Sequence, residues 1–416
     1  MRIIYLLLIF ACNTLPAASL LLGPMVGHVD DHSAKIWCAL DEEGEIKLSI
    51  SEDPNLKDAQ IITGKNFEMG PITIDGLKAN TLYYYQIQAH QYSKSARSHF
   101  KTMKPLGESL KLRFLFSSCS GKTGSDEDAI WDDISQLEDV DLILMLGDNH
   151  YADSTNPDVI TKHYLSHRSI AGFKRATSRI PTYGIWDDHD YGPNNSDGKT
   201  QGKEDSLEIF KAHWANPSYG EKGNPGIYFT YSIGDIQFIM LDSRYHRTPN
   251  QSMDSTDPAK TLLGDRQLKW LEETLSKSKA RVKIVSGGSN FELQGSNDGF
   301  KGFKVEQKKI LDLFQQTEGV ILLSGDRHFT AGYHIGEKTI EITSGPLGSG
   351  TVTPKKTPDM FFKETEGKMF SIFEIDTQTK TPKVKLEVYR AGTGLIRTMN
   401  FSWKQINGLE TIAQEN

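Results

Sequence analysis

The chain has 416 residues, a formal net charge of −7 and 37% hydrophobic residues, which is the composition of an ordinary globular protein. Three cysteines are too few for a disulfide-built scaffold, and the mildly acidic balance argues against a broad nucleic-acid-binding surface. A chain of this length exceeds what one hydrophobic core usually supports, so two domains are expected.

The first 19 residues have the features of a secretory signal peptide. Arg2 provides a positive start, residues 3–11 form an apolar run of roughly half a membrane span, and small residues at 17–19 offer a cleavage site. Cys12 stands in a context similar to a lipoprotein box, so it either carries a lipid anchor or leaves with the leader. No other stretch is apolar and long enough for a transmembrane segment. We therefore expect an exported protein that is periplasmic, secreted or lipid-anchored at the cell surface.

Residues 20–103 are predicted to form an N-terminal all-β domain. Short alternating runs follow one another without a helical segment between them, which is typical of a β-sandwich. Within residues 33–40 the alternation places Cys38 on an inward face, as a small hydrophobic residue, and Trp37 on the opposite face. A short motif also resembles the fibronectin type III signature, carried by Leu77, Thr81 and Tyr83. We therefore expect a fibronectin-like β-sandwich.

After a linker at 104–109 the pattern becomes that of an α/β domain, predicted over residues 110–403. Near-continuous apolar runs, typical of buried strands, alternate with segments of helical spacing. The apolar runs cover 112–116, 140–146, 181–185, 227–232, 236–241, 282–286 and 320–324. The helical segments cover 126–137, 158–178, 203–214, 264–278 and 304–316. The remaining residues, 404–416, are expected to be a loose polar tail.

Four of the predicted strands end in polar clusters, at 116–120, 146–151, 185–194 and 323–328. Ligands of α/β sheets gather at the carboxyl ends of strands, so these loops are expected to meet. Five carboxylates would then raise one another's pKa unless multivalent cations were bound: Asp148, Asp187, Asp188, Asp190 and Asp326. An isolated Gly-Asp would indicate a turn or a helix cap. Four such clusters in one domain instead favour a site for more than one metal.

Three of these clusters carry a resemblance to a known family. They are Gly147-Asp148 followed by Tyr151, Trp186-Asp-Asp-His-Asp190, and Gly325-Asp-Arg-His328. Together with Ser118-Cys119 they resemble the PhoD-like alkaline phosphatase and phosphodiesterase family, a branch of the metallophosphatase superfamily. The resemblance covers the whole mature chain. It implies an α/β (layered α+β) fold, with a metallophosphatase β-sandwich-type catalytic domain flanked by helices.

The resemblance also implies a binuclear or trinuclear site that holds ferric iron (Fe3+) and calcium. The iron ligands would be Cys119, Asp148, Tyr151 and Asp326. Asp148 would bridge to the second metal, and the set would be completed by Asp188 and His328. The donor chemistry agrees, because thiolate and phenolate suit trivalent iron whereas calcium prefers carboxylate oxygens. Other divalent metals remain open.

The candidate catalytic residues follow from their positions beside these ligands. His189, next to Asp188, is expected to donate a proton to the leaving oxygen or to bind a phosphate oxygen; the alternative is a structural histidine held by Asp190. The side chains of Arg168 and Arg244 are candidates for a bidentate grip on phosphate, or for tying a loop to a carboxylate. The remaining candidates for contact with a metal or the phosphate are Asn194 and Asn195.

The chain departs from the family pattern in two places. The superfamily usually has a histidine at a further strand end, whereas residues 284–291 contain none, and Ser289 or Asn290 is the replacement available there. Founding members of the branch carry a twin-arginine leader, whereas this leader has a lone Arg2. Export would then precede folding and metals would load outside, which leaves the identity of the native ion open.

The sequence therefore predicts an exported metal-dependent phosphoric ester hydrolase of the alkaline phosphatase or phosphodiesterase type. Its substrate would be a small phosphate ester or phosphodiester, attacked in line by a metal-activated hydroxide. The alternative from another class is a catalytically silent metal- or ligand-binding protein on the same scaffold. A third interpretation treats the N-terminal domain as a carbohydrate- or surface-binding module.

Overall fold

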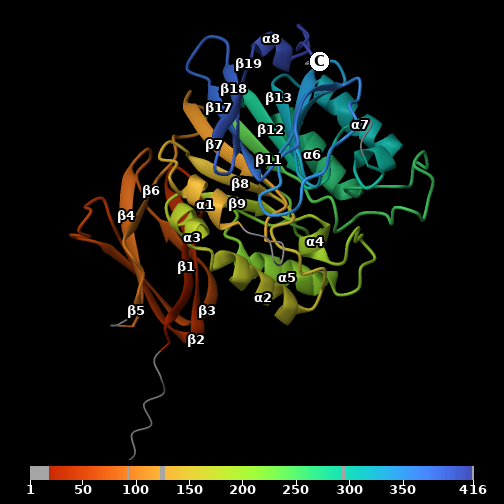
Figure 1. Ribbon diagram of the computed structural model, residues 1–416. Helices are drawn as coiled ribbons and strands as arrows, with labels where there is room; N and C mark the ends of the chain where they lie inside the picture. Colours follow the sequence, from red (N-terminus) through yellow and green to blue (C-terminus); the bar gives the residue numbers. More distant parts are fainter. Residues whose placement is uncertain (1–17, 91–92, 122–126, 293–295, 415–416) are drawn as a thin grey trace, which may run out of the picture.

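The computed structural model describes residues 18–90, 93–121, 127–292 and 296–414 (Figure 1). Residues 1–17, which include Cys12 and most of the expected leader, lie outside this described part. None of the helices in the described part has the length and apolar content required to cross a lipid bilayer.

The first described part of the chain is all-β, as the alternating pattern predicts. Its six strands are hydrogen-bonded into one sheet, in which the long β2 pairs with β1, β3 and β4. The strands are β1 (Leu20–Val29), β2 (Ser33–Ser51), β3 (Gln60–Asp75), β4 (Leu82–His90), β5 (Ser93–Lys94) and β6 (Ser98–Lys101). Cys38 is fully buried, as expected, and so is Trp37 on the opposite face. Both faces of β2 are therefore covered at this point.

Two further sheets form the rest of the molecule. The first has the order β19-β18-β17-β7-β8-β9, in which β7, β8 and β9 are parallel. Its strands are β7 (Lys111–Ser117), β8 (Leu142–Leu146), β9 (Thr182–Ile185), β17 (Met369–Asp376), β18 (Lys383–Arg390) and β19 (Gly394–Phe401).

The second of these sheets has the order β10-β11-β12-β13-β15-β14-β16, with a parallel centre from β11 to β15. Its strands are β10 (Phe229–Ile233), β11 (Ile236–Met240), β12 (Val282–Gly287), β13 (Val320–Ser324), β14 (Thr330–Ile335), β15 (Thr339–Thr343) and β16 (Met360–Glu364). The apolar runs predicted before residue 325 correspond to strands β7 to β13. Strands β14 to β19 were not predicted.

The two sheets pack face to face and helices cover their outer faces. Phe114 of β7 packs edge-on against Phe238 of β11, with ring centroids 5.3 Å apart, so an aromatic core lies between the sheets. A second core under α6 and α7 joins Leu271 and Phe314 to Leu322 of β13. The result is a helix–sheet–sheet–helix arrangement (Figure 1). It confirms the predicted α/β class with a β-sandwich-type domain flanked by helices.

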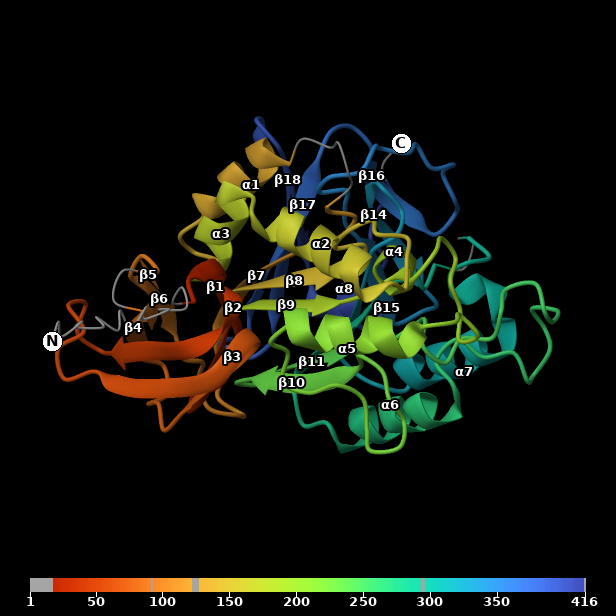
Figure 2. The same cartoon turned by 90° about the horizontal axis from the view of Figure 1, so that it is seen from below.

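The helices lie close to the predicted segments. The segment predicted over 158–178 is two helices, because Ser169 and Ile170 interrupt it. The α-helices are α1 (Asp128–Ser135), α2 (Pro157–Arg168), α3 (Ala171–Thr177), α4 (Asp188–Tyr191), α5 (Lys203–His213), α6 (Asp265–Lys277), α7 (Lys304–Gln315) and α8 (Trp403–Ile406); a short 3-10 helix is η1 (Phe300–Gly302). Figure 2 shows α2 and α5 beside β8 and β9, next to the N-terminal strands.

The predicted loose tail is partly ordered against the domain. Helix α8 begins with a capping box at Ser402, and Ile406 is fully buried. The side chain of Asn407 accepts a hydrogen bond from the backbone N–H of Gly319 (2.8 Å). The apolar residues in this polar segment are few, so its composition alone did not indicate that it packs.

Candidate metal centre

The polar clusters at the strand ends converge, and two glycines make the approach possible. Gly147 has a φ of +94°, and a Cβ there would lie 2.8 Å from the Cβ of Asp187. A Cβ on Gly325 would lie 2.5 Å from the backbone oxygen of Leu146 and 2.7 Å from the Cβ of Ser118. Since Gly325 follows β13 and Leu146 ends β8, the glycines bring the ends of the two sheets into contact.

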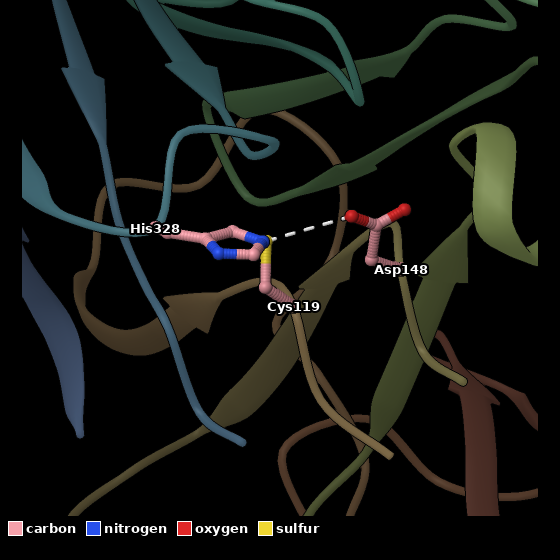
Figure 3. Close-up of side chains that lie close together, drawn as sticks. All are labelled: Cys119, Asp148 and His328. Carbon is pink, nitrogen blue, oxygen red and sulfur yellow. Dashed lines mark hydrogen bonds between the residues drawn. The ribbon is translucent and has the colours of Figure 1, made fainter. Parts of the chain in front are cut away.

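Three candidate ligands form the first group at this junction. The side chains of Cys119, Asp148 and His328 each offer a ligand atom, and these atoms all lie within 4.8 Å of one another (Figure 3). The Cys119 Sγ lies 3.6 Å from Asp148 Oδ2. The Tyr151 hydroxyl lies 3.4 Å from Asp148 Oδ2 and 3.1 Å from His328 Nε2, and it accepts a hydrogen bond from Ser349 Oγ (2.6 Å). Thiol, phenol, carboxylate and imidazole donors therefore surround one position.

A second group shares Asp148 with the first. Ligand atoms of Asp148, Asp188 and His189 also lie within 4.8 Å of one another. One oxygen of Asp188 accepts a hydrogen bond from the backbone N–H of Asn195 (2.7 Å). The shared carboxylate is the arrangement expected where one side chain bridges two cations.

These carboxylates are candidate cation ligands because they are buried and repel one another. Burial, and then the charges of Asp188 and its neighbours, raise the pKa of Asp148 well above its usual range. Burial also raises the pKa of Asp326 to about 7, with further contributions from Asp187 and Asp188. Among the aspartates of the polar clusters, three buried oxygens have no hydrogen-bond partner in the described part of the chain: Asp148 Oδ1, Asp187 Oδ2 and Asp188 Oδ1. Bound cations would neutralise this repulsion and would bind the oxygens that lack hydrogen-bond partners.

The pKa values of the Cys119 thiol and the Tyr151 phenol are also raised. Burial, followed by the charge of Asp148, raises the pKa of Cys119 well above its usual range, and burial with Cys119 raises the pKa of Tyr151. Neither side chain ionises in such surroundings without a nearby positive charge. A metal ion would supply that charge, because coordination deprotonates a thiol outright.

His189 lies beside the candidate ligands, but it is not held by Asp190. Its Nδ1 lies 2.5 Å from Asp153 Oδ1, and its ring lies 4.3 Å from that of Tyr151. Asp190 instead accepts hydrogen bonds from the backbone N–H groups of Asn149 and Asp187 (2.9 and 3.0 Å), which fastens the second loop to the third. Asp153 was not singled out in the sequence, because an aspartate beyond Tyr151 carries no pattern that links it to His189.

Arg244 lies next to the aspartates and is fully buried. Its Nε donates to Asp187 Oδ1 (2.5 Å), and its Nη2 donates to Asp298 Oδ2 (2.7 Å) and lies 3.5 Å from Asp188 Oδ1. Burial opposes the charge, but these three carboxylates raise the pKa of Arg244 well above its ordinary value. The contacts match the alternative in which this arginine ties loops to carboxylates.

Arg168 and Asn194 are not brought together with the candidate ligands. The guanidinium of Arg168 is buried and lies 4.2 Å from the centre of the Trp37 ring. Asn194 is exposed, and in that loop it is the backbone of Asn195 that contacts Asp188. A sequence shows that a residue is near a motif, but not which way its side chain points.

The strand end without histidine offers an amide instead. Asn290 follows β12 and is buried, and both polar atoms of its side chain lack a hydrogen-bond partner among the described residues. The neighbouring Ser289 donates a hydrogen bond to Ser243 Oγ (3.2 Å). A Cβ on Gly288 would lie 2.8 Å from the Cβ of Asp187, so this loop reaches the aspartates. Of the two predicted replacements, Asn290 is therefore the one whose polar atoms are buried without a hydrogen-bond partner among the described residues.

Comparisons with known proteins show which families this chain is similar to. A family model described as PhoD-like phosphatase matches residues 114–404, and one described as a domain of unknown function (DUF7800) matches residues 17–104. Alkaline phosphatase D of Bacillus subtilis (strain 168) is 24% identical over 339 residues, which cover 67% of this chain and 57% of that protein.

Two solved structures share the fold over most of the chain. The structure of PhoD is similar with a TM-score of 0.74 and 20% identity, covering 91% of this chain and 92% of the other. Purple acid phosphatase PPD1 from yellow lupin (Lupinus luteus) seeds has a TM-score of 0.68 and 14% identity, covering 91% and 74%.

Proposed function

Because the chain belongs to the PhoD-like phosphatase family, we propose that it is a metal-dependent phosphoric ester hydrolase. The observation that carries the proposal is the buried Asp148, which lies beside Cys119, Tyr151 and His328 and whose Oδ1 has no hydrogen-bond partner among the described residues. The alignment spans only part of alkaline phosphatase D, so that protein supports the reaction class and not a particular substrate. Small phosphomonoesters and phosphodiesters are the proposed substrates.

We assign the two groups to different metals. Cys119, Tyr151 and Asp326, with Asp148, would hold ferric iron, since a thiolate and a phenolate stabilise a trivalent ion. His328, which lies in the first group, would complete the iron ligands. Asp148 would bridge to calcium or another divalent ion, which Asp188 would also hold; calcium accepts oxygen ligands in flexible geometry. Bound metals of this kind polarise phosphoryl oxygens and lower the pKa of a bound water.

The remaining residues act around that centre. The Nδ1 of His189 is engaged by Asp153, so its Nε2 is the ring nitrogen that can give a proton to the leaving oxygen. Arg244 keeps Asp187 and Asp188 in place and balances their charge. Phosphate binding by Arg168 or Asn194 has no support in their surroundings, and we do not include it in the mechanism.

The proposal also includes export, on the strength of residues 1–19, with or without lipid at Cys12. Nothing in the catalytic assignment depends on this step. Cell fractionation of the wild type and of Cys12→Ala would test it separately.

Hydrolysis of p-nitrophenyl phosphate and of bis(p-nitrophenyl) phosphate by the full chain tests the proposed reaction. At least one ester should turn over, and a chelator should abolish the activity until metal is restored. Absence of turnover with every metal supplied, iron and calcium included, would contradict the proposal and favour the catalytically silent alternative.

A further inference from the structure

The last turn of α2 contacts both the N-terminal sheet and the loops of the candidate metal centre. Three residues of this turn make the contacts: Tyr164, His167 and Arg168. All three are buried. Their partners belong to three separate parts of the chain, so this turn is a point where those parts are joined.

Arg168 makes the contact with the N-terminal sheet. Its Cζ lies 4.2 Å from the ring centre of Trp37 in β2, and 5.2 and 5.3 Å from those of Tyr164 and Trp214. Arg168 is 2% exposed, and neither Nη1 nor Nη2 has a hydrogen-bond partner among the described residues. The ring quadrupoles attract a desolvated cation that lies over the faces of aromatic rings. The guanidinium is therefore held by its aromatic cage and not by a carboxylate.

Trp37 is itself fixed to the opposite side of the interface. Its Nε1 donates a hydrogen bond to the backbone oxygen of Ala212 (2.8 Å). Nearby in β1, the backbone N–H of His28 donates a hydrogen bond to the backbone oxygen of Ala215 (2.7 Å). The side chain of Lys35 donates to the backbone oxygens of Asn216 and Pro217. The N-terminal sheet is thus fastened to the segment after α5 and to the last turn of α2.

The other two residues reach the metal-centre loops. The Nε2 of His167 lies 2.8 Å from Ser120 Oγ, and Ser120 directly follows Cys119. Ser120 Oγ also donates to Glu127 Oε2 (2.8 Å), and its backbone N–H donates to the oxygen of Asp148 (2.8 Å). The ring of Tyr164 packs edge-on against that of His150, with ring centroids 4.2 Å apart. His150 lies between Asp148 and Tyr151 in the chain, so this contact joins their loop to α2.

We propose that the N-terminal domain is a positioning element of the metal centre, which acts through the contact of Trp37 with Arg168. The contact fixes the last turn of α2, and that turn fixes the loops that carry Cys119, Asp148 and Tyr151. This inference rests on the proposed metal centre and gives a role to the region that matches a domain of unknown function. It competes with the interpretation of that region as a separate binding module.

Cobalt binding to the full chain tests the inference, because a thiolate ligand gives Co²⁺ a charge-transfer absorption in the near ultraviolet. Trp37→Phe and Arg168→Lys are compared with the wild type. The matched control is Lys35→Met, which removes two hydrogen bonds at the same interface without touching α2. We expect each of the first two variants to weaken Co²⁺ binding about 10-fold and to lower the absorption per bound ion, as changes behind metal ligands commonly do. The control should resemble the wild type.

Two outcomes would overturn the inference while leaving the metal centre in place. One is wild-type cobalt affinity and absorption in both variants, and the other is an equal loss in Lys35→Met. If Arg168→Lys does not fold, Arg168→Met replaces it, since an apolar side chain leaves no charge buried; the same outcomes then apply. Failure of the wild type to bind Co²⁺ would instead overturn the proposed metal centre together with this inference.

Discussion

At the scale of single residues, the candidate ligands occupy unusual backbone conformations. Positive φ values are found at Cys119 (58°), Asp148 (51°), Asp326 (67°) and His328 (54°). Such a conformation costs most non-glycine residues roughly 1–2 kcal/mol, although aspartate adopts it more readily. Four residues with this conformation lie in one cluster despite its energetic cost. Such strained residues commonly gather at functional sites. The sequence motifs located these residues, but nothing in them indicated the backbone strain.

Replacing the thiol should separate metal binding from folding. Cys119→Ser removes the soft donor with little change in volume, so we expect bound iron to fall by at least about 10-fold while the fold persists. Cys38→Ser is the matched control, because Cys38 is equally buried but lies in the N-terminal sheet. Elemental analysis and circular dichroism measure the two properties. Unchanged iron in Cys119→Ser would show that the thiolate is not a ligand.

The contact of His189 with Asp153 leads to a second prediction. His189→Ala should depress turnover more for esters with poor leaving groups than for p-nitrophenyl esters, because poor leaving groups need a proton. Asp153→Asn should show the same selectivity with a smaller loss, about 10-fold, since the histidine stays but loses its partner. Asp158→Asn, in the first turn of α2, is the control.

An equal loss for good and poor leaving groups would assign His189 to phosphate or metal binding instead. Its ring nitrogen lies within 4.8 Å of ligand atoms of Asp148 and Asp188, so that outcome has a structural basis. The ratio of the two turnover losses therefore decides between the roles.

At the scale of elements, prediction succeeded where a strand has a nearly continuous run of apolar residues. The strand Leu142–Leu146 is buried at every position and reads as a continuous apolar run. In contrast, β19 (Gly394–Phe401) is buried only at its last residue, so it lacks an apolar run even though it pairs with the preceding strand β18. The missed strands β14 to β19 complete both sheets, so the sequence predicted the fold class but not the full strand order.

Strand β15 carries a buried acid whose protonation should be measurable. Burial raises the pKa of Glu341 from its ordinary 4.5 to about 8, although Ser324 and the N–H of Phe291 donate to it. The folded state therefore holds a proton that the unfolded chain releases above pH 4.5. The resulting stability is fully present below pH 4.5 and is lost as the pH rises through about 8.

We expect Glu341→Gln to remove that part of the pH dependence, because an amide does not ionise. The free energy of unfolding of the wild type relative to the variant should decline by a few kcal/mol between pH 5 and pH 9, measured by denaturant titration in chelator. Glu337→Gln, on the exposed turn before β15, should follow the wild type. Parallel curves for the wild type and Glu341→Gln would show that Glu341 is ionised throughout.

At the scale of the whole molecule, the site is made where the ends of two sheets meet. The sequence predicted this convergence because each polar cluster begins where an apolar run stops, and chain direction then places the clusters at one edge. The side-chain partners across the junction could not be predicted, because contacts such as that of Arg244 with Asp187 depend on side-chain directions and on loops far apart in the chain. The contact of Trp37 with Arg168, which joins the N-terminal sheet to the helices, could not be predicted for the same reason.

The central claim is that these converging loops are the active site of a metal-dependent phosphoesterase, and one comparison of turnover tests it most directly. Asp148→Asn removes the carboxylate shared by both groups, whereas Asp312→Asn removes an exposed carboxylate on α7. With metal supplied to each, phosphoester turnover should fall by at least about 100-fold in Asp148→Asn and remain at the wild-type rate in Asp312→Asn. Wild-type turnover in Asp148→Asn would contradict the account.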